Sequence, residues 1–214
     1  MKQQVHYPGM NDPRERPLLR IRRDERGGAI DFNIDEYTPQ KMVLADYVSV
    51  ERGTQGVRIV FGKAKAFPQE PKGLALSYAL EVSFPHFQFC NQLYASFVQP
   101  GENGEPIADT IKRAVAENGY EPIDAMAKAS SADREGHVRA NAGVTVVMQD
   151  DVSVDFVHVD PGTVRQAVKR DKVPGDLNGV RVVMSPNVAL YFANRVCAVA
   201  EELLRKTPGL KRKA

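Results

Sequence analysis

A histidine and an aspartate two residues apart are the pair in this sequence best spaced to bind a metal ion. His158 and Asp160 follow an alternating segment, where side chains two positions apart share one strand face. No third ligand accompanies them, so we interpret His158 as a half-exposed strand histidine. His86 directly follows Pro85, and we expect it at a helix start, facing water or backbone donors. The sequence therefore predicts no metal centre and no cofactor.

The possible nucleophiles have simpler structural interpretations. Cys90 and Cys197 fall on expected apolar helix faces or their margins, where cysteine behaves as a small hydrophobic residue. Two cysteines also make neither a disulfide framework nor a four-ligand zinc site. Ser185 lacks the flanking glycines of a nucleophile elbow and stands where a helix cap belongs. We expect none of the three to be catalytic.

Glycine-rich and acidic segments do not complete an active site either. Residues 53–56 lack the Gly-Lys-Ser/Thr ending of a phosphate loop, and residues 101–104 lack the longer spacing of a dinucleotide-binding loop. An enzyme with its site in the 160–178 loop is the weakest alternative, because that loop supplies charged residues without any evident geometry. No acid, base and nucleophile combine, and we predict that the protein is not an enzyme.

Aromatic side chains concentrate at two expected strand-to-helix corners. These residues are Phe84, Phe87, Phe89, Tyr94 and Phe97 at the first corner, and Tyr191 and Phe192 at the second. The helix of the first corner is apolar on more than one side, which is typical of a core helix or a subunit interface rather than a ligand groove. We predict that these seven residues form an interface or protein-binding surface.

Alternating and turn-forming segments place the corners at the ends of two β-meanders. Strands are expected at 29–34, 43–50, 57–61, 74–84, 143–148, 152–159 and 179–184. Pro85 ends a strand before a helix at 86–98, and Pro186 begins a helix that continues to about Lys206. The fold class is therefore α+β, with two similar units of antiparallel meander and Pro-led helix, related by a possible pseudo-twofold axis.

The domain organisation follows from these elements. Residues 1–27 form an irregular arm whose apolar cluster around Leu19 could add an edge strand. The first unit covers 28–130 and includes a helical insertion, with one helix around 107–115, Gly119 at its C-terminal end and a second helix at 122–130. Residues 131–142 are a polar connector, and the second unit covers 143–214.

Composition excludes several classes of protein. The 214 residues are 43% hydrophobic and 26% charged, with no apolar run long enough to span a membrane and no apolar N-terminal segment typical of a secretory signal. We expect a cytoplasmic protein. The net charge of +2 is small, but basic residues gather at the two ends. Those that could contact nucleic acid are Arg14, Arg16, Arg20, Arg22, Arg23, Lys211, Arg212 and Lys213.

The segment Ser185–Cys197 resembles a corner of the bacterial export chaperone SecB. In that family too, a strand ends in a Pro-Asn pair before an aromatic-containing helix with a small residue at the position of Ala193. Pro85-His86 looks like a looser version, and the arrangement also resembles a short uncharacterised bacterial domain family. The resemblance implies an ATP-independent chaperone that holds unfolded polypeptide on apolar surfaces. SecB is acidic, whereas this chain is slightly basic.

Two functional hypotheses follow. The first is a non-enzymatic protein-binding module, a SecB-like chaperone or scaffold that forms a homo-oligomer and binds polypeptide or a partner subunit on sheet and helix surfaces. The alternative is a nucleic-acid-binding accessory protein of phage or mobile-element type, which would use the basic ends on phosphates.

Overall fold

The structure, a computed structural model, describes residues 19–24, 27–32, 41–65, 74–100, 104–148, 150–160, 162 and 179–210. Its strands are β1 (Leu19–Asp24), β2 (Gly27–Phe32), β3 (Lys41–Ala45), β4 (Tyr47–Arg52), β5 (Gly56–Ala64), β6 (Leu74–Pro85), β7 (Ala129–Arg139), β8 (Ala142–Val147), β9 (Val152–Val157) and β10 (Gly179–Met184). Its helices are α1 (His86–Gln88), the π-helical η2 (Phe89–Tyr94), α2 (Ala95–Val98), α3 (Ile107–Glu117), α5 (Pro186–Lys206) and the 3-10 turn η3 (Pro208–Leu210). The predicted α+β class is confirmed.

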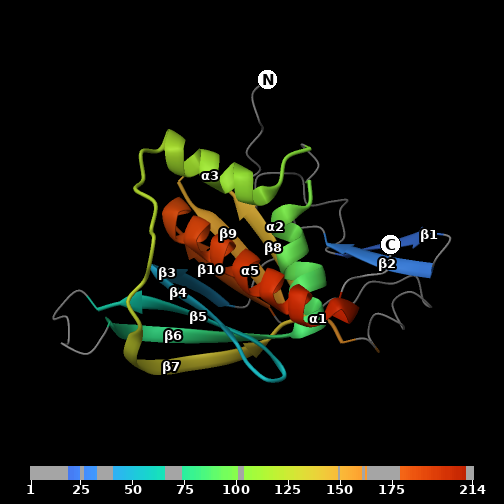
Figure 1. Ribbon diagram of the computed structural model, residues 1–214, viewed down its shortest axis with the longest axis horizontal. Helices are drawn as coiled ribbons and strands as arrows, with labels where there is room; N and C mark the ends of the chain where they lie inside the picture. The colour runs from blue at the N-terminus through green and yellow to red at the C-terminus, as the bar shows by residue number, and fades with distance from the viewer. Residues whose placement is uncertain are drawn as a thin grey trace.

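Two four-stranded sheets form the body of the molecule. Sheet I has the order β4–β5–β6–β7, and sheet II has the order β3–β10–β9–β8. Three strands of each sheet, consecutive in the chain, are antiparallel, and the fourth is parallel to its neighbour. A helix follows the third antiparallel strand in both, and Figure 1 shows the second of these, α5, crossing the middle of the molecule with α3 beside it.

Each half of the chain supplies the fourth strand of the other half's sheet. β3 precedes β4 in the sequence but pairs with β10, and β7 precedes β8 but pairs with β6. The chain crosses between sheets at Asp46 and again at Ala140-Asn141. The two predicted units therefore share their sheets and do not form separate domains.

These crossings correct two expectations from the sequence. Residues 43–50 are not one strand, because Asp46 separates β3 from β4 and sends them into different sheets. Residues 131–142 are not a connector, because β7 runs to Arg139 in parallel register with β6. A strand of small polar side chains such as β7 is difficult to predict from sequence, because it forms by pairing with a distant strand and not because of its local propensity.

The two crossings have the same hydrogen-bond geometry. At the first, the Asp46 amide donates to Gly62 in β5 (3.1 Å), and Asp46 Oδ1 accepts from the Ala64 amide (2.7 Å). At the second, the Asn141 amide donates to the end of β9 (3.0 Å), and Asn141 Oδ1 accepts from the Val159 amide (2.8 Å). An Asx side chain at each crossing thus bonds the backbone that would otherwise lose its ladder partner.

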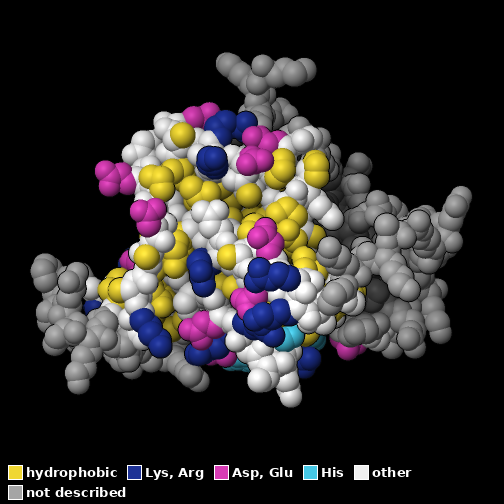
Figure 2. Space-filling view, in the orientation of Figure 1, with side chains coloured by type: hydrophobic (Ala, Val, Ile, Leu, Met, Phe, Trp, Pro, Cys, Tyr) yellow, Lys and Arg dark blue, Asp and Glu magenta, His cyan; other side chains and the backbone are white. Residues whose placement is uncertain are grey.

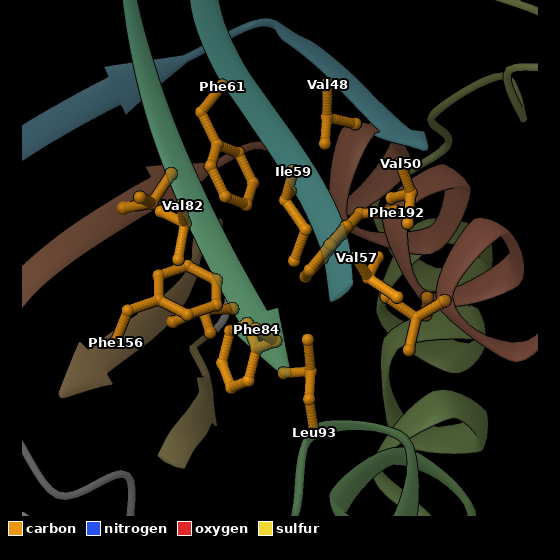
Figure 3. Packing of buried hydrophobic residues seen from close by; sticks show 14 of the residues in the cluster. Val48, Val50, Val57, Ile59, Phe61, Val82, Phe84, Leu93, Phe156 and Phe192 are labelled. Atoms are coloured by element: carbon orange, nitrogen blue, oxygen red, sulfur yellow. The ribbon is translucent and has the colours of Figure 1, made fainter. Parts of the chain in front are cut away.

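Strand register also matches between the sheets. The facing pairs are Val57–Phe84, Ile59–Val82 and Phe61–Leu80 in sheet I, and Val152–Met184, Val154–Val182 and Phe156–Val180 in sheet II. Alternate residues of these strands point into one continuous core that both sheets and all the longer helices share. The rings of Phe61 and Phe156 lie 5.3 Å apart at its centre, and Phe192 of α5 packs against both (Figure 3).

A π-helical turn changes which side of the first corner helix is buried. Phe89, Cys90, Leu93 and Phe97 face the core, whereas Phe87 is 46% exposed. The wider π turn, with its i→i+5 hydrogen bonds, shifts the buried face relative to a regular α-helix. The helix itself was predicted correctly over 86–98.

The remaining helices follow local sequence signals closely. Gly119 follows α3 with φ +68°, and the amides of Gly119 and Tyr120 bond back to Ala116 and Val115 in a Schellman motif. The second helix expected at 122–130 is wrong, because residues 121–128 have no regular secondary structure. Pro186 occupies the first position of α5, as predicted.

The N-terminal arm is described only in part. Its strand β1 pairs antiparallel with β2, so residues 19–24 are not irregular. Arg14, Arg16 and the basic residues 211–213 lie outside the described residues. Within the described part of the chain, none of the helices combines the length and apolar character that crossing a membrane requires.

Candidate functional site

The seven aromatic residues predicted as an interface separate into buried and exposed groups. Phe84, Phe89, Phe97 and Phe192 are each no more than 1% exposed. Their rings pack on one another and on Phe156, with centroids 5.7–6.5 Å apart in mostly edge-to-face geometry. These four side chains stabilise the core and present no surface to a partner in this conformation.

The other three aromatic residues reach the surface of the helical layer. Phe87 is exposed on α1, and Tyr94 and Tyr191 are half-buried. Burial, with the nearby Glu201 carboxylate and the two cysteines, raises the pKa of Tyr94. Figure 2 shows apolar side chains on this side of the molecule, interspersed with charged ones. This mixed surface does not distinguish a binding site from an ordinary solvated one.

The two cysteines lie in surroundings that suppress thiolate chemistry. Cys90 is buried, and Cys197 is half-buried on α5. Burial raises the pKa of both thiols, and the Glu201 carboxylate adds to the effect at Cys197. A reactive cysteine needs the opposite environment, with a lowered pKa and solvent access.

A serine, a histidine and a glutamate meet on the outer face of sheet I, a cluster that the sequence analysis missed. Ser83 Oγ lies 3.0 Å from His137 Nε2, and Glu81 Oε1 lies 3.9 Å from the same nitrogen. A catalytic relay needs the carboxylate on the other ring nitrogen, so these residues do not form a hydrolytic triad. The parallel register of β6 and β7 creates this cluster, and it becomes visible only once β7 is recognised as a strand.

His158 and Asp160 do not assemble a metal site. Among the described residues, no three His, Cys, Asp or Glu side chains are grouped as metal ligands would be. The His158 side chain is half-buried, and its Nδ1 has no hydrogen-bond partner among the described residues.

The outer face of sheet II carries a buried ion pair. Arg181 Nε and Nη2 donate to the two carboxylate oxygens of Asp155 at 2.7 and 2.8 Å, from adjacent positions on β10 and β9. The Asp155 side chain is 5% exposed and that of Arg181 is 13% exposed. This bidentate geometry neutralises both charges on a face where Val144, Ser153 and Val183 are close neighbours.

The edge of sheet II exposes two large apolar side chains. Met42 is 64% exposed and Leu44 is 52% exposed, both on the outer face of β3. β3 ends the sheet, and among the described strands only β10 pairs with it. An open hollow of about 190 Å³ adjoins this edge; its lining includes Leu44, Asp46, Lys63, Asp151, Val183 and Ser185.

β7 holds the equivalent edge position in sheet I and has the opposite character. Opposite Ser83 it carries Arg139, as β3 carries Leu44 opposite Val183. His137 likewise stands at the place of Met42, and both β7 residues are exposed. Charged side chains are a common protection for sheet edges, and β3 lacks them on this face.

Comparison with models of protein families, with curated proteins and with solved structures gives no match. The candidate site is therefore defined by the geometry of this chain alone, and it consists of the β3 edge with its adjoining hollow.

Proposed function

We propose that this protein is a non-enzymatic protein-binding module, a SecB-like chaperone or scaffold, that binds a partner polypeptide at the edge of sheet II. The observation that carries the proposal is the exposure of Met42 and Leu44 on an edge strand. The sequence analysis placed the binding surface at the aromatic corners, and the burial of four of those seven residues supports moving it to β3.

Strand addition is the binding mode that fits this edge. An extended segment that pairs with β3 would gain main-chain hydrogen bonds along its length. Its alternate side chains would cover Met42 and Leu44 and reach the adjoining hollow, whose lining mixes apolar residues with Asp46, Lys63 and Asp151. Such binding needs no nucleotide and tolerates many sequences, as a chaperone or scaffold requires.

We further propose that the two halves of the chain descend from one duplicated unit. The matching registers and the matching Asp46 and Asn141 crossings support this proposal. A duplicated fold also accounts for the contrast between β3 and β7, because one edge could acquire a binding role while the other stayed protected.

The test of the binding function replaces the β3 edge by the residues of its counterpart. The double variant Met42→His with Leu44→Arg gives β3 the exposed side chains of β7 and leaves its inward residues unchanged. We expect the wild-type chain to suppress light scattering from a chemically unfolded model protein after dilution, and the double variant to lose most of this activity.

Phe87→Lys is the matched control, because it removes an exposed apolar side chain of similar accessibility on α1. It should leave the activity of the wild-type chain unchanged. Equal activity of the wild-type chain and the double variant would contradict the assignment to β3, and loss of activity in Phe87→Lys would return the surface to the helical corner.

A further inference from the structure

We infer that β3 also pairs with the β3 strand of a second copy of this chain, in an antiparallel pair centred on Val43 that competes with other polypeptides for this edge. The inference rests on the proposed function and names its partner. The two copies would be related by a twofold axis, and the two sheets II would join across it.

The exposed side chains of β3 are self-complementary in this register. A pair centred on Val43 sets Met42 of each copy opposite Leu44 of the other. The four apolar side chains then lie together on one face, where directly opposed residues have Cβ atoms about 4.5–5.5 Å apart. A shift by one residue would set Met42 against a side chain of the opposite face, so burial selects this register.

The other described edges of the two large sheets are less suited to self-association. β7 exposes His137 and Arg139, and the outer end of β4 exposes Glu51 and Arg52, with α5 packed along that strand. β8 is half-buried and contacts η2 and α3. Among the strand residues of the two large sheets whose exposure the structure describes, the exposed large apolar side chains are Met42 and Leu44 of β3.

A pair of five-residue strands is a small interface, well below the roughly 800 Å² per partner of a standard complex. The dimer should therefore be concentration-dependent, with dissociation in the micromolar range. Size exclusion with light scattering should show the mass rising from the 23.7 kDa of one chain towards twice that value as concentration increases.

The Met42→His, Leu44→Arg variant should weaken the dimer at least about tenfold, because like charges and lost apolar contacts replace the opposed Met–Leu pairs. Phe87→Lys should dimerise as the wild-type chain does. Circular dichroism and thermal unfolding verify that each variant is folded, since the exchanged residues are exposed.

Cysteine cross-linking tests the register itself, in a Cys197→Ala background that leaves only the buried Cys90. A mixture of Met42→Cys and Leu44→Cys chains should form a disulfide-linked pair, because those positions face each other directly. Either variant alone brings its cysteines only to the diagonal separation of about 7–8 Å, beyond the usual reach of a disulfide. Equal cross-linking in all three samples would overturn the register.

The outcomes separate this inference from the proposed function. A wild-type chain that stays monomeric at all concentrations yet holds unfolded polypeptide through β3 overturns the dimer and leaves the binding function intact. A monomer without holding activity overturns both. A dimer that survives the Met42→His, Leu44→Arg exchange overturns the inference of a β3 interface.

Discussion

β3 and β7 are two strands with one position in the fold and two different surfaces. Each precedes a meander, crosses to the other sheet at an Asx residue and pairs in parallel with that sheet's third meander strand. Their inward residues Val43 and Val138 occupy matching positions, but their outward residues are apolar in β3 and charged or polar in β7. The backbone arrangement therefore does not determine the surface that an edge strand presents, whereas its outward side chains do.

The outer faces of the two sheets also differ in how far their charged side chains are exposed to solvent. On sheet I, Arg58 and Glu81 form an ion pair at 2.8 Å with side chains 41% and 21% exposed. On sheet II, the Asp155–Arg181 pair is almost fully buried. The ion pair on the outer face of sheet I is therefore partly exposed to solvent, whereas the ion pair on the outer face of sheet II is shielded from it.

The shared core should make the two sheets equally sensitive to loss of their central rings. Phe61→Ala and Phe156→Ala each remove a fully buried ring at matching positions, and we expect each to lower the free energy of unfolding by about 3–5 kcal/mol. Urea unfolding followed by circular dichroism measures both. Losses that differ by several kcal/mol would show that the two sheets do not contribute equally to one core.

The outer faces should respond unequally to the loss of an arginine. Arg181→Met leaves the buried Asp155 carboxylate without its bidentate partner, and we expect a destabilisation of about 3 kcal/mol or more. Arg58→Met is the matched change on sheet I, where solvent screens the exposed pair and the expected loss is about 0–1 kcal/mol. Similar losses in the two variants would refute the contrast between the faces.

Sequence reasoning succeeded where structure is encoded within a few residues. Gly119 after α3 and Pro186 at the start of α5 both act locally, and both predictions are confirmed, as are the strands expected at 57–61, 74–84 and 179–184. The helix cap expected at Ser185 is a local prediction that the structure does not confirm. Its hydroxyl donates to Asn187 Oδ1, and no side-chain hydrogen bond from Ser185 caps the helix.

The features that sequence reasoning missed depend on contacts between distant residues. Ser83 and His137 are 54 positions apart, and only the pairing of β6 with β7 joins them. The exposure of Leu44 depends on the position of β3 at the end of its sheet. The sequence analysis treated residues 43–50 as one strand and therefore did not predict this position. An Ala-Asx pair stands at each crossing, Ala45-Asp46 and Ala140-Asn141, but the same pair also occurs at 108–109, 132–133 and 193–194, so it does not predict a crossing.

Substitutions at the two crossings between the sheets should give the smallest changes in the free energy of unfolding, and they test whether the two crossings are stabilised in the same way. Asp46→Ala and Asn141→Ala each remove an acceptor for a backbone amide and should cost about 1 kcal/mol, with the larger loss at the less exposed Asn141. Asp46→Asn keeps an oxygen at the same place and should be nearly neutral. Urea unfolding of the three variants at one pH makes the comparison. If Asp46→Asn were as damaging as Asp46→Ala, the carboxylate charge rather than the Asx hydrogen bond would stabilise the first crossing, and the two crossings would differ in mechanism.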